Sequence, residues 1–397
     1  MYAYTSISFG ESDKRLLKQG PKQNRVKKMN IWKSLSESME EVEGSRAYDG
    51  YYYSIGDVLK ILVCGLLCGI QVAKHILEWS NQAPVKLFFA KELGIEKLPS
   101  YPQFMRILEI ISPEKFAEAF NEWARTAFST SAKTVSIDGK AIRGAEHRSG
   151  QTLNIASALV AETGVVIGTK YCGGKGNEKA AFRDLLSFLD VKGSIVVADA
   201  LHCNTKSAQC VIKAEANYLF VVKKNNASLY EDLKLFFSDP PKDVVTEHTT
   251  TEKNGGRIET RTGFVAKNLY RFGQKYPELK TIGAIRRQFE KDGVKSDEWH
   301  FYISSASLSA HELLIHARAE WRVESMHWIL DVHFGEDRTL ILGKNAQQTS
   351  NIARKAVINM VKAYQTTQDA KKPFSWYLRQ NLFDVANLAA FIQSFCT

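Results

Sequence analysis

The sequence predicts a mixed α/β chain with a helical segment in front and a β-rich insertion inside the α/β part. Apolar residues recur at helical spacing through residues 54–130, whereas short β-prone runs alternate with helical patterns after residue 132. Strand-like runs return between polar turns over residues 240–305, which predicts the insertion. The length of 397 residues allows one to three domains.

The helical segment begins at Ser54, a residue that caps helices and here precedes a run of apolar residues at helical spacing. The run Ile61–Ile70 is far shorter than the roughly 20 residues that span a bilayer, so we expect a buried helix there, with Cys64 and Cys68 in its core. Further helices are expected over Ala73–Asn81, Pro84–Glu92, Ser100–Ile111 and Ser112–Ser129.

The α/β part opens with a predicted three-strand meander and then alternates strands with helices. The expected strands are Thr134–Ile137, Leu153–Val160, Val165–Tyr171, Ser194–Ala198 and Tyr218–Val222, with helices over 177–189 and 206–216. The insertion should contain strands Gly256–Val265, Thr281–Gln288 and Trp299–Ser304, and helices should follow over 310–332, 345–367 and 383–395.

The charge balance favours a polyanionic partner, with nucleic acid first. Lys and Arg number 53 against 43 Asp and Glu, which gives a formal net charge of +10. Half of this excess lies in residues 1–28, so residues 1–45 are predicted to form a basic, mobile arm, with Met29 as an alternative start. The six cysteines lack zinc-finger or disulfide-scaffold spacing, and no signal peptide is visible, which favours the cytoplasm.

Two aspartates follow predicted strands directly. Asp138 comes after Thr134–Ile137, and Asp199 after Ile195–Ala198. The carboxyl ends of sheet strands are where α/β proteins usually build their sites. Taken singly, each aspartate is more simply interpreted as a turn or cap residue.

A third acid is expected on the helix predicted over 310–332. At about 100° per residue, Glu324 and Asp331 lie together at one edge of an apolar stripe, although a solvated flank is the alternative. The stripe consists of Leu314, Trp321, Trp328 and Val332. Three such carboxylates suit Mg²⁺, and two ions about 4 Å apart can support in-line displacement at a phosphodiester.

Cations near these acids could hold phosphates by charge, the alternative being ordinary solvated loop charge. Lys140 and Arg143 follow Asp138, and Lys223 and Lys224 follow a predicted strand. More cations that could extend a DNA track, or lie on the surface without such a role, are Arg338, Lys344, Arg354 and Lys355.

Three segments in this order resemble DDE transposases of the ISAs type, also called H-repeat-associated proteins: Ser136–Gly144, Val197–Cys203 and Trp321–Arg338. The resemblance extends to Lys175–Glu178 and Phe220–Asn226. Residues 54–130 are similar to the N-terminal associated domain of that family, so the resemblance covers roughly residues 45–365.

The resemblance implies an RNase H-like catalytic domain over 131–397, with a β-rich insertion at about 240–305, behind a helical domain over 46–130 for DNA-end binding or assembly. Its acidic triad maps to Asp138, Asp199 and Glu324. Asp331, two turns further on the same helix face as Glu324, stays a candidate either for a supporting position beside the ligands or for a substitute ligand. The implied cofactor is Mg²⁺, or Mn²⁺, as two ions. The implied partners are double-stranded DNA, as element ends and target, and further copies of the chain assembled on it at the nucleoid.

The implied activity is metal-dependent cleavage at the ends of an insertion element, followed by strand transfer to target DNA. Two alternatives remain open from the sequence. One is a nuclease of the same RNase H-like fold without strand transfer, and the other is a catalytically silent DNA-binding protein descended from a transposase.

Overall fold

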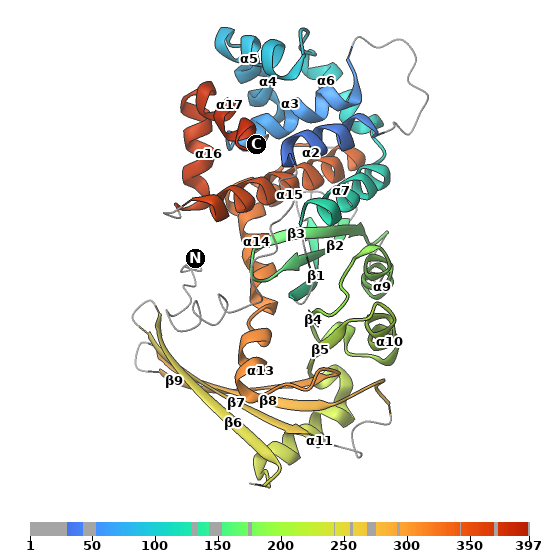
Figure 1. Ribbon diagram of the computed structural model, residues 1–397, viewed down its shortest axis with the longest axis vertical. Coiled ribbons are helices and arrows are strands. Elements are labelled where there is room, and N and C mark those ends of the chain that lie inside the picture. The colour runs from blue at the N-terminus through green and yellow to red at the C-terminus, as the bar shows by residue number, and fades with distance from the viewer. Residues whose placement is uncertain are drawn as a thin grey trace. The chain divides into compact units, whose positions relative to one another are not determined.

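The computed structural model describes residues 30–42, 53–128, 130, 133–142, 153–173, 177–241, 243–254, 257–267, 275–291, 294–341, 343–368 and 372–395. They form a mixed α/β structure with a large sheet and many helices (Figure 1). They divide into two compact units. Within the described ranges, the first unit holds residues 130–138 and 190–321, and the second holds 30–128, 139–189 and 322–395.

The first unit is built on parallel strands that continue into an antiparallel sheet. Strands β1 (Thr134–Ile142), β4 (Ile195–Ala198) and β5 (Asn217–Val222) are parallel neighbours. The apolar residues of β4 and β5 are buried, as expected of central strands. Strand β5 then pairs with β9 (Val294–Ser304), so the β-rich insertion extends the same hydrogen-bonded sheet.

The insertion is confirmed as an antiparallel sheet in the order β9-β8-β7-β6, with β8 at Thr281–Lys291, β7 at Arg257–Lys267 and β6 at Val245–Asn254. Helices α11 (Ala227–Ser238) and α13 (Ala310–Ala317) cover opposite faces of this sheet (Figure 1). Helix α13 approaches closely because β7 has a glycine beneath it: a Cβ on Gly263 would lie 2.8 Å from the Ala310 carbonyl oxygen. Helix α11 was not expected from the sequence.

The remaining helical turns of the first unit follow its parallel strands. A 3₁₀ turn at Ala200–His202 and helix α10 (Thr205–Lys213) come after β4, and a 3₁₀ turn at Lys224–Asn226 comes after β5. These turns lie where the candidate site residues of this unit are found.

The second unit contains the predicted N-terminal helices, each close to its expected bounds: α3 (Ile55–Leu67), α4 (Ala73–Ser80), α5 (Ala83–Leu93), α6 (Tyr101–Ile110) and α7 (Pro113–Ala127). Ser54 caps α3 as expected, because its hydroxyl accepts a hydrogen bond from the Asp57 N–H at 2.9 Å. Cys64 and Cys68 are buried, as predicted. Among the described residues, no helix is long and apolar enough to cross a membrane.

These helices share their hydrophobic core with the C-terminal part of the chain. Helix α14 spans Glu320–Val332, and α15 (Lys344–Thr367), α16 (Phe374–Phe383) and α17 (Val385–Gln393) follow it. Helix α15 packs against α3, α6 and α7. The compact units therefore differ from the three consecutive segments of the sequence analysis, because residues distant in sequence complete one core.

Residues 31–40 depart from the expected mobile arm. They form helix α2 (Ile31–Glu40), whose Trp32, Leu35 and Met39 are buried. The Trp123 indole N–H of α7 donates to the Ile31 carbonyl at 3.2 Å. The expectation rested on charge and overlooked the helical spacing of these apolar residues. Residues 1–29 lie outside the described part of the chain.

Strands β2 (Leu153–Val160) and β3 (Val165–Tyr171) form an antiparallel hairpin, followed by helix α9 (Glu178–Phe188). Strand β3 is the last strand in the order β3-β2-β1. Asn359 of α15 bonds the N–H and the carbonyl of Val166, both at 2.7 Å, and Asn121 of α7 bonds those of Thr169 at 2.8 and 3.1 Å. Two asparagines thus satisfy backbone groups at an edge that would otherwise attract another strand.

The helix predicted over 310–332 is interrupted. Helix α13 ends at Ala317 and α14 begins at Glu320. The predicted apolar stripe assumed one continuous helix, so its residues do not share one face across the two helices. Trp328 and Val332, expected in the buried stripe, are 36% and 44% exposed. The buried residues of α14 are Val323, Met326, Ile329 and Leu330.

Candidate functional site

Asp138 and Asp199 lie at the same level of two neighbouring parallel strands, Asp138 within β1 and Asp199 directly after β4. The expectation that the strand ends before Asp138 is wrong, because β1 continues to Ile142. The parallel register pairs Ile137 of β1 with Ala198 of β4, and each aspartate is the next residue. Neighbouring strands run about 4.8 Å apart, and residues at the same level point to the same face of the sheet. Both aspartates are partly exposed. The structure therefore brings these two predicted acids together.

The Asp199 carboxylate is anchored through one oxygen. Its Oδ1 accepts a hydrogen bond from the Leu201 N–H at 3.0 Å and so caps the 3₁₀ turn that follows β4. The buried His202 places its Nε2 4.0 Å from the same oxygen. The Asp199 side chain remains 39% exposed. A carboxylate that is held in place and yet reaches solvent can bind an ion or a substrate.

Two predicted cations lie at the same edge of the sheet. Lys223 and Lys224 follow β5 and are exposed, and β5 runs parallel to β4. The Asn225 side chain donates to the Ala200 carbonyl at 2.7 Å, which ties this turn to the one behind Asp199. Arg143, the fourth predicted cation, lies outside the described residues.

Glu324 is exposed on α14 and belongs to the second unit, so its approach to the two aspartates stays a prediction. One turn further on, burial and the charges of Lys140 and Lys355 lower the pKa of His327 to about 3, which keeps this imidazole neutral. Within the described ranges, no three His, Cys, Asp or Glu side chains are grouped closely enough to hold a metal ion.

Lys140 contacts carboxylates of its own chain. Its ammonium pairs with Asp331 and lies 3.2 Å from a Glu336 oxygen and 3.8 Å from an Asp337 oxygen. The side chain is only 12% exposed. Burial raises the pKa of Asp331, whereas the hydrogen bond from Lys140 opposes that rise. This ion pair engages both side chains within the chain, which disfavours Lys140 as a phosphate contact and Asp331 as a metal ligand.

Glu336 is the fully buried centre of this cluster. Its Oε1 accepts hydrogen bonds from Asn351 at 2.7 Å and from Arg354 at 3.2 Å. Burial alone would raise the pKa of Glu336, but the positive charges of Arg354 and Lys140 outweigh it and hold the pKa at about 2. The sequence analysis did not single out Glu336.

Arg354 and Lys355 are buried, so the expectation of a DNA track or a surface position is wrong for them. Lys355 donates to the Thr169 hydroxyl at 2.7 Å, and burial lowers its pKa to about 7. A signal was present in the sequence, because small and apolar residues surround both cations on every side of α15.

Comparison with known proteins identifies the class. Residues 129–360 match the family described as Transposase DDE domain, and residues 36–124 match the one described as DDE_Tnp_1-associated. The chain belongs to the DDE transposase family. The match includes Asp138, Asp199 and Glu324.

Relatives of the chain in that family include H-repeat-associated putative transposases. The chain is 30% identical over 326 residues to "H repeat-associated putative transposase YhhI" of Escherichia coli K12, covering 78% of this chain and 85% of the relative. It is 28% identical over 327 residues to "Putative transposase YncI" of E. coli O157:H7, covering 78% and 82%. A solved piggyBac transposase synaptic complex with hairpin DNA aligns with TM-score 0.46 and 11% identity over 94% of this chain and 79% of that one, a likeness too low to carry an argument.

Proposed function

We propose that this chain is a metal-dependent transposase that cuts DNA at the ends of an insertion element and joins the freed 3′-hydroxyls to target DNA. The observation that carries the proposal is the pair Asp138, within β1, and Asp199, directly after β4, at the same level of two neighbouring parallel strands and within the residues that match the DDE family. Glu324 completes the proposed triad. The strand order β3-β2-β1-β4-β5 supports the RNase H-like core that the resemblance implies.

The donor set of this pair fits Mg²⁺. Both side chains supply carboxylate oxygens, and Asp199 is anchored by a backbone N–H while it remains accessible. Proteins usually hold Mg²⁺ through one or two carboxylates, with water and substrate phosphate completing the coordination. When bound at such a site, two ions activate the attacking hydroxyl and stabilise the leaving oxygen of a phosphodiester. Mn²⁺, which shares the preference for oxygen ligands, is the alternative ion.

Lys223 and Lys224 are proposed to contact DNA phosphates. Replacing both with glutamine is expected to weaken DNA binding regardless of sequence and to reduce the slope of log affinity against log salt by about 1–2, since each phosphate contact contributes about 0.9. Binding titrations from low to moderate salt measure this slope. The matched control is Lys192→Gln with Lys213→Gln, two exposed lysines near the opposite, amino ends of β4 and β5. An equal loss of slope in the control pair would show that the two lysines hold no special position.

The activity itself is tested with purified protein, Mg²⁺, DNA that carries the inverted repeats flanking the gene, and a target plasmid. We expect cuts at the repeat ends and joined products in the target. Cuts without joined products would favour the nuclease alternative, and DNA binding without cuts would favour the silent DNA-binding protein. Because two ends must be brought together, we also expect the chain to assemble as a homo-oligomer on the end DNA, at the nucleoid in the cytoplasm.

A further inference from the structure

Trp321, in the first turn of α14, lies close to two arginines of the sheet formed by β6–β9. The Arg261 and Arg287 guanidinium carbons are 5.0 and 5.3 Å from the centre of a Trp321 ring. These arginines lie directly opposite each other in the register of β7 and β8. Like charges directly opposite each other destabilise a sheet. The pair Arg261 and Arg287 therefore needs neighbouring negative charges, and a pair that breaks a local rule in this way is expected to have a functional role.

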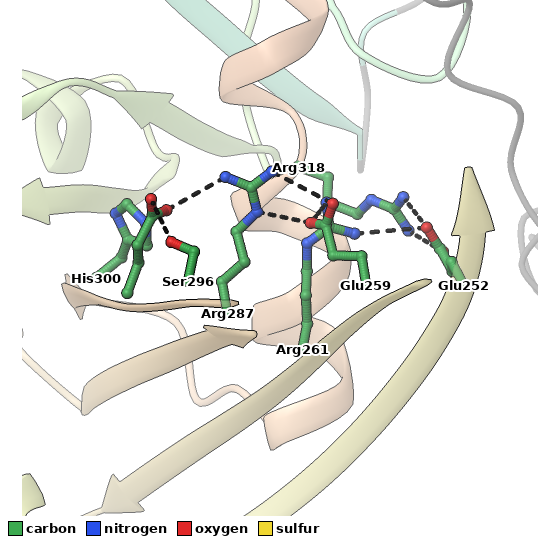
Figure 2. Close-up of polar contacts among 8 residues, drawn as sticks. Glu252, Glu259, Arg261, Arg287, Ser296, His300 and Arg318 are labelled. Carbon is green, nitrogen blue, oxygen red and sulfur yellow. Dashed lines mark hydrogen bonds and ion pairs between the residues drawn. The ribbon is translucent and has the colours of Figure 1, made fainter. Parts of the chain in front are cut away.

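Two glutamates, the buried Glu259 and the partly exposed Glu252, supply the compensation (Figure 2). Glu259 is only 3% exposed and pairs with Arg261, and it also accepts hydrogen bonds from Arg287 at 2.6 and 3.2 Å. Glu252 accepts two hydrogen bonds from Arg318, at 2.6 and 2.7 Å, and a weaker one from Arg261 at 3.4 Å. We call this set the arginine cradle: Glu252, Glu259, Arg261, Arg287 and Arg318.

The cradle lies at the interruption between α13 and α14. Arg318 is the C-cap residue directly after α13, and Trp321 is the second residue of α14. The residues between the two helices contain no glycine or proline, so local propensity does not explain the interruption. The contacts of Arg318 and Trp321 with the sheet supply a tertiary reason for it.

The chemistry of the cradle favours orientation over bulk stability. Partly buried ion pairs are a weak source of stability compared with apolar packing, but bidentate arginine pairs have a defined geometry. Two guanidinium groups close to one indole ring add attraction that also depends on orientation. The cradle therefore holds Trp321 in one position and sets the direction in which α14 begins.

We propose that the arginine cradle is a positioning device for α14: by holding Trp321 it fixes Glu324, three residues further along the same helix, and so controls the affinity of the site for its metal ions. This inference rests on the proposed function, because it treats Glu324 as a metal ligand. The cradle residues act through Trp321 and are therefore positioning residues.

The test compares two neighbouring arginines of β8 that point to opposite faces. Arg287→Gln removes a cradle residue. Arg286→Gln is the matched control, because Arg286 also lies over a tryptophan, Trp299, at 5.6 Å, but on the face away from the cradle. Arg287→Gln is expected to raise the Mg²⁺ concentration for half-maximal end cleavage by about 10–100-fold, the usual effect of losing a residue that orients a ligand. Arg286→Gln should stay within about twofold of the parent, and DNA affinity should not change in either variant.

A second readout does not depend on cleavage. Binding of Mn²⁺ to the protein–DNA complex, followed by loss of the electron paramagnetic resonance signal of free Mn²⁺, should weaken by a similar factor in Arg287→Gln. If that variant does not fold, the same two measurements are made on Trp321→Leu, which should weaken metal binding. Trp321→Phe, which keeps an aromatic ring in the cradle, should restore it. Thermal midpoints establish that the compared proteins are folded.

The positioning role would be overturned if folded Arg287→Gln or Trp321→Leu needed the same Mg²⁺ concentration for half-maximal cleavage as the parent. It would also be overturned if Arg286→Gln and Arg287→Gln raised that concentration equally. Failure of the proposed function gives a different result. In that case the parent protein shows no metal-dependent end cleavage, or the replacement of Asp199 by asparagine leaves that cleavage intact, whatever the cradle variants do.

Discussion

Asp199→Asn is expected to reduce metal-dependent end cleavage by about a thousandfold or more while the protein stays folded. The amide keeps the oxygen that accepts the hydrogen bond from the Leu201 N–H, so the turn behind β4 remains capped. What is lost is a negative charge that would hold a metal ion. Metal ions supply several kcal/mol of transition-state stabilisation, and about 4 kcal/mol corresponds to a thousandfold in rate. Asp138→Asn should behave in the same way.

The measurement is the single-turnover rate of cutting at the element end in Mg²⁺, with DNA affinity determined in parallel. Asp190→Asn is the matched control, because Asp190 is an exposed aspartate near the amino end of β4. It should cut at the parent rate. Parent-like cutting by either Asp199→Asn or Asp138→Asn would remove that residue from the site.

The same assay separates the two acids of α14. Glu324→Gln should lose cleavage, whereas Asp331→Asn should affect chiefly stability, because Asp331 pairs with Lys140. The opposite result would move the third ligand from Glu324 to Asp331.

The position of Asp199 could be predicted because its signal is local. Four apolar residues in a row, Ile195–Ala198, indicate a buried strand, and an aspartate directly after them lies at the carboxyl end of that strand. The same reasoning ended the first strand too early, at Ile137, because the second half of β1 contains polar residues and a glycine. Helices within residues 55–127 were predictable for a similar reason, because capping residues mark their first turns in the sequence. Ser54 caps α3, and Ser112 caps α7.

The features that the sequence analysis missed depend on distant partners. Arg354 and Lys355 resemble surface cations until the carboxylate of Glu336 and the hydroxyl of Thr169 are brought to them. The end of α13 is set by Glu252, a residue far away in the sequence. Neither hydrophobic periodicity nor capping preference contains such information, because both describe a segment by itself.

Glu336→Gln is expected to lower the free energy of unfolding of the second unit by about 3–5 kcal/mol, the usual cost of breaking a buried ion pair from one side. Glutamine has nearly the same size, so the change removes charge without opening a cavity. Arg354, with a side chain 3% exposed, and Lys140 would then be buried beside a neutral amide. Urea unfolding at pH 7 measures the loss. Asp337→Asn is the control: Asp337 is 28% exposed and 3.8 Å from Lys140, and its replacement should cost less than about 1 kcal/mol.

The pH dependence of that difference gives a sharper test, because its sign is fixed. The pKa of Glu336 is about 2 in the folded chain, below the value of about 4.3 for an unfolded glutamate. A depressed carboxyl pKa stabilises the fold fully above the unfolded pKa, and this contribution disappears as the pH falls through the folded pKa. The gap between parent and Glu336→Gln should therefore be constant from pH 7 to about 5 and narrow steadily towards pH 2. A gap that stays constant over the whole range would mean that the buried charge of Glu336 does not stabilise the cluster, and that its packing alone does.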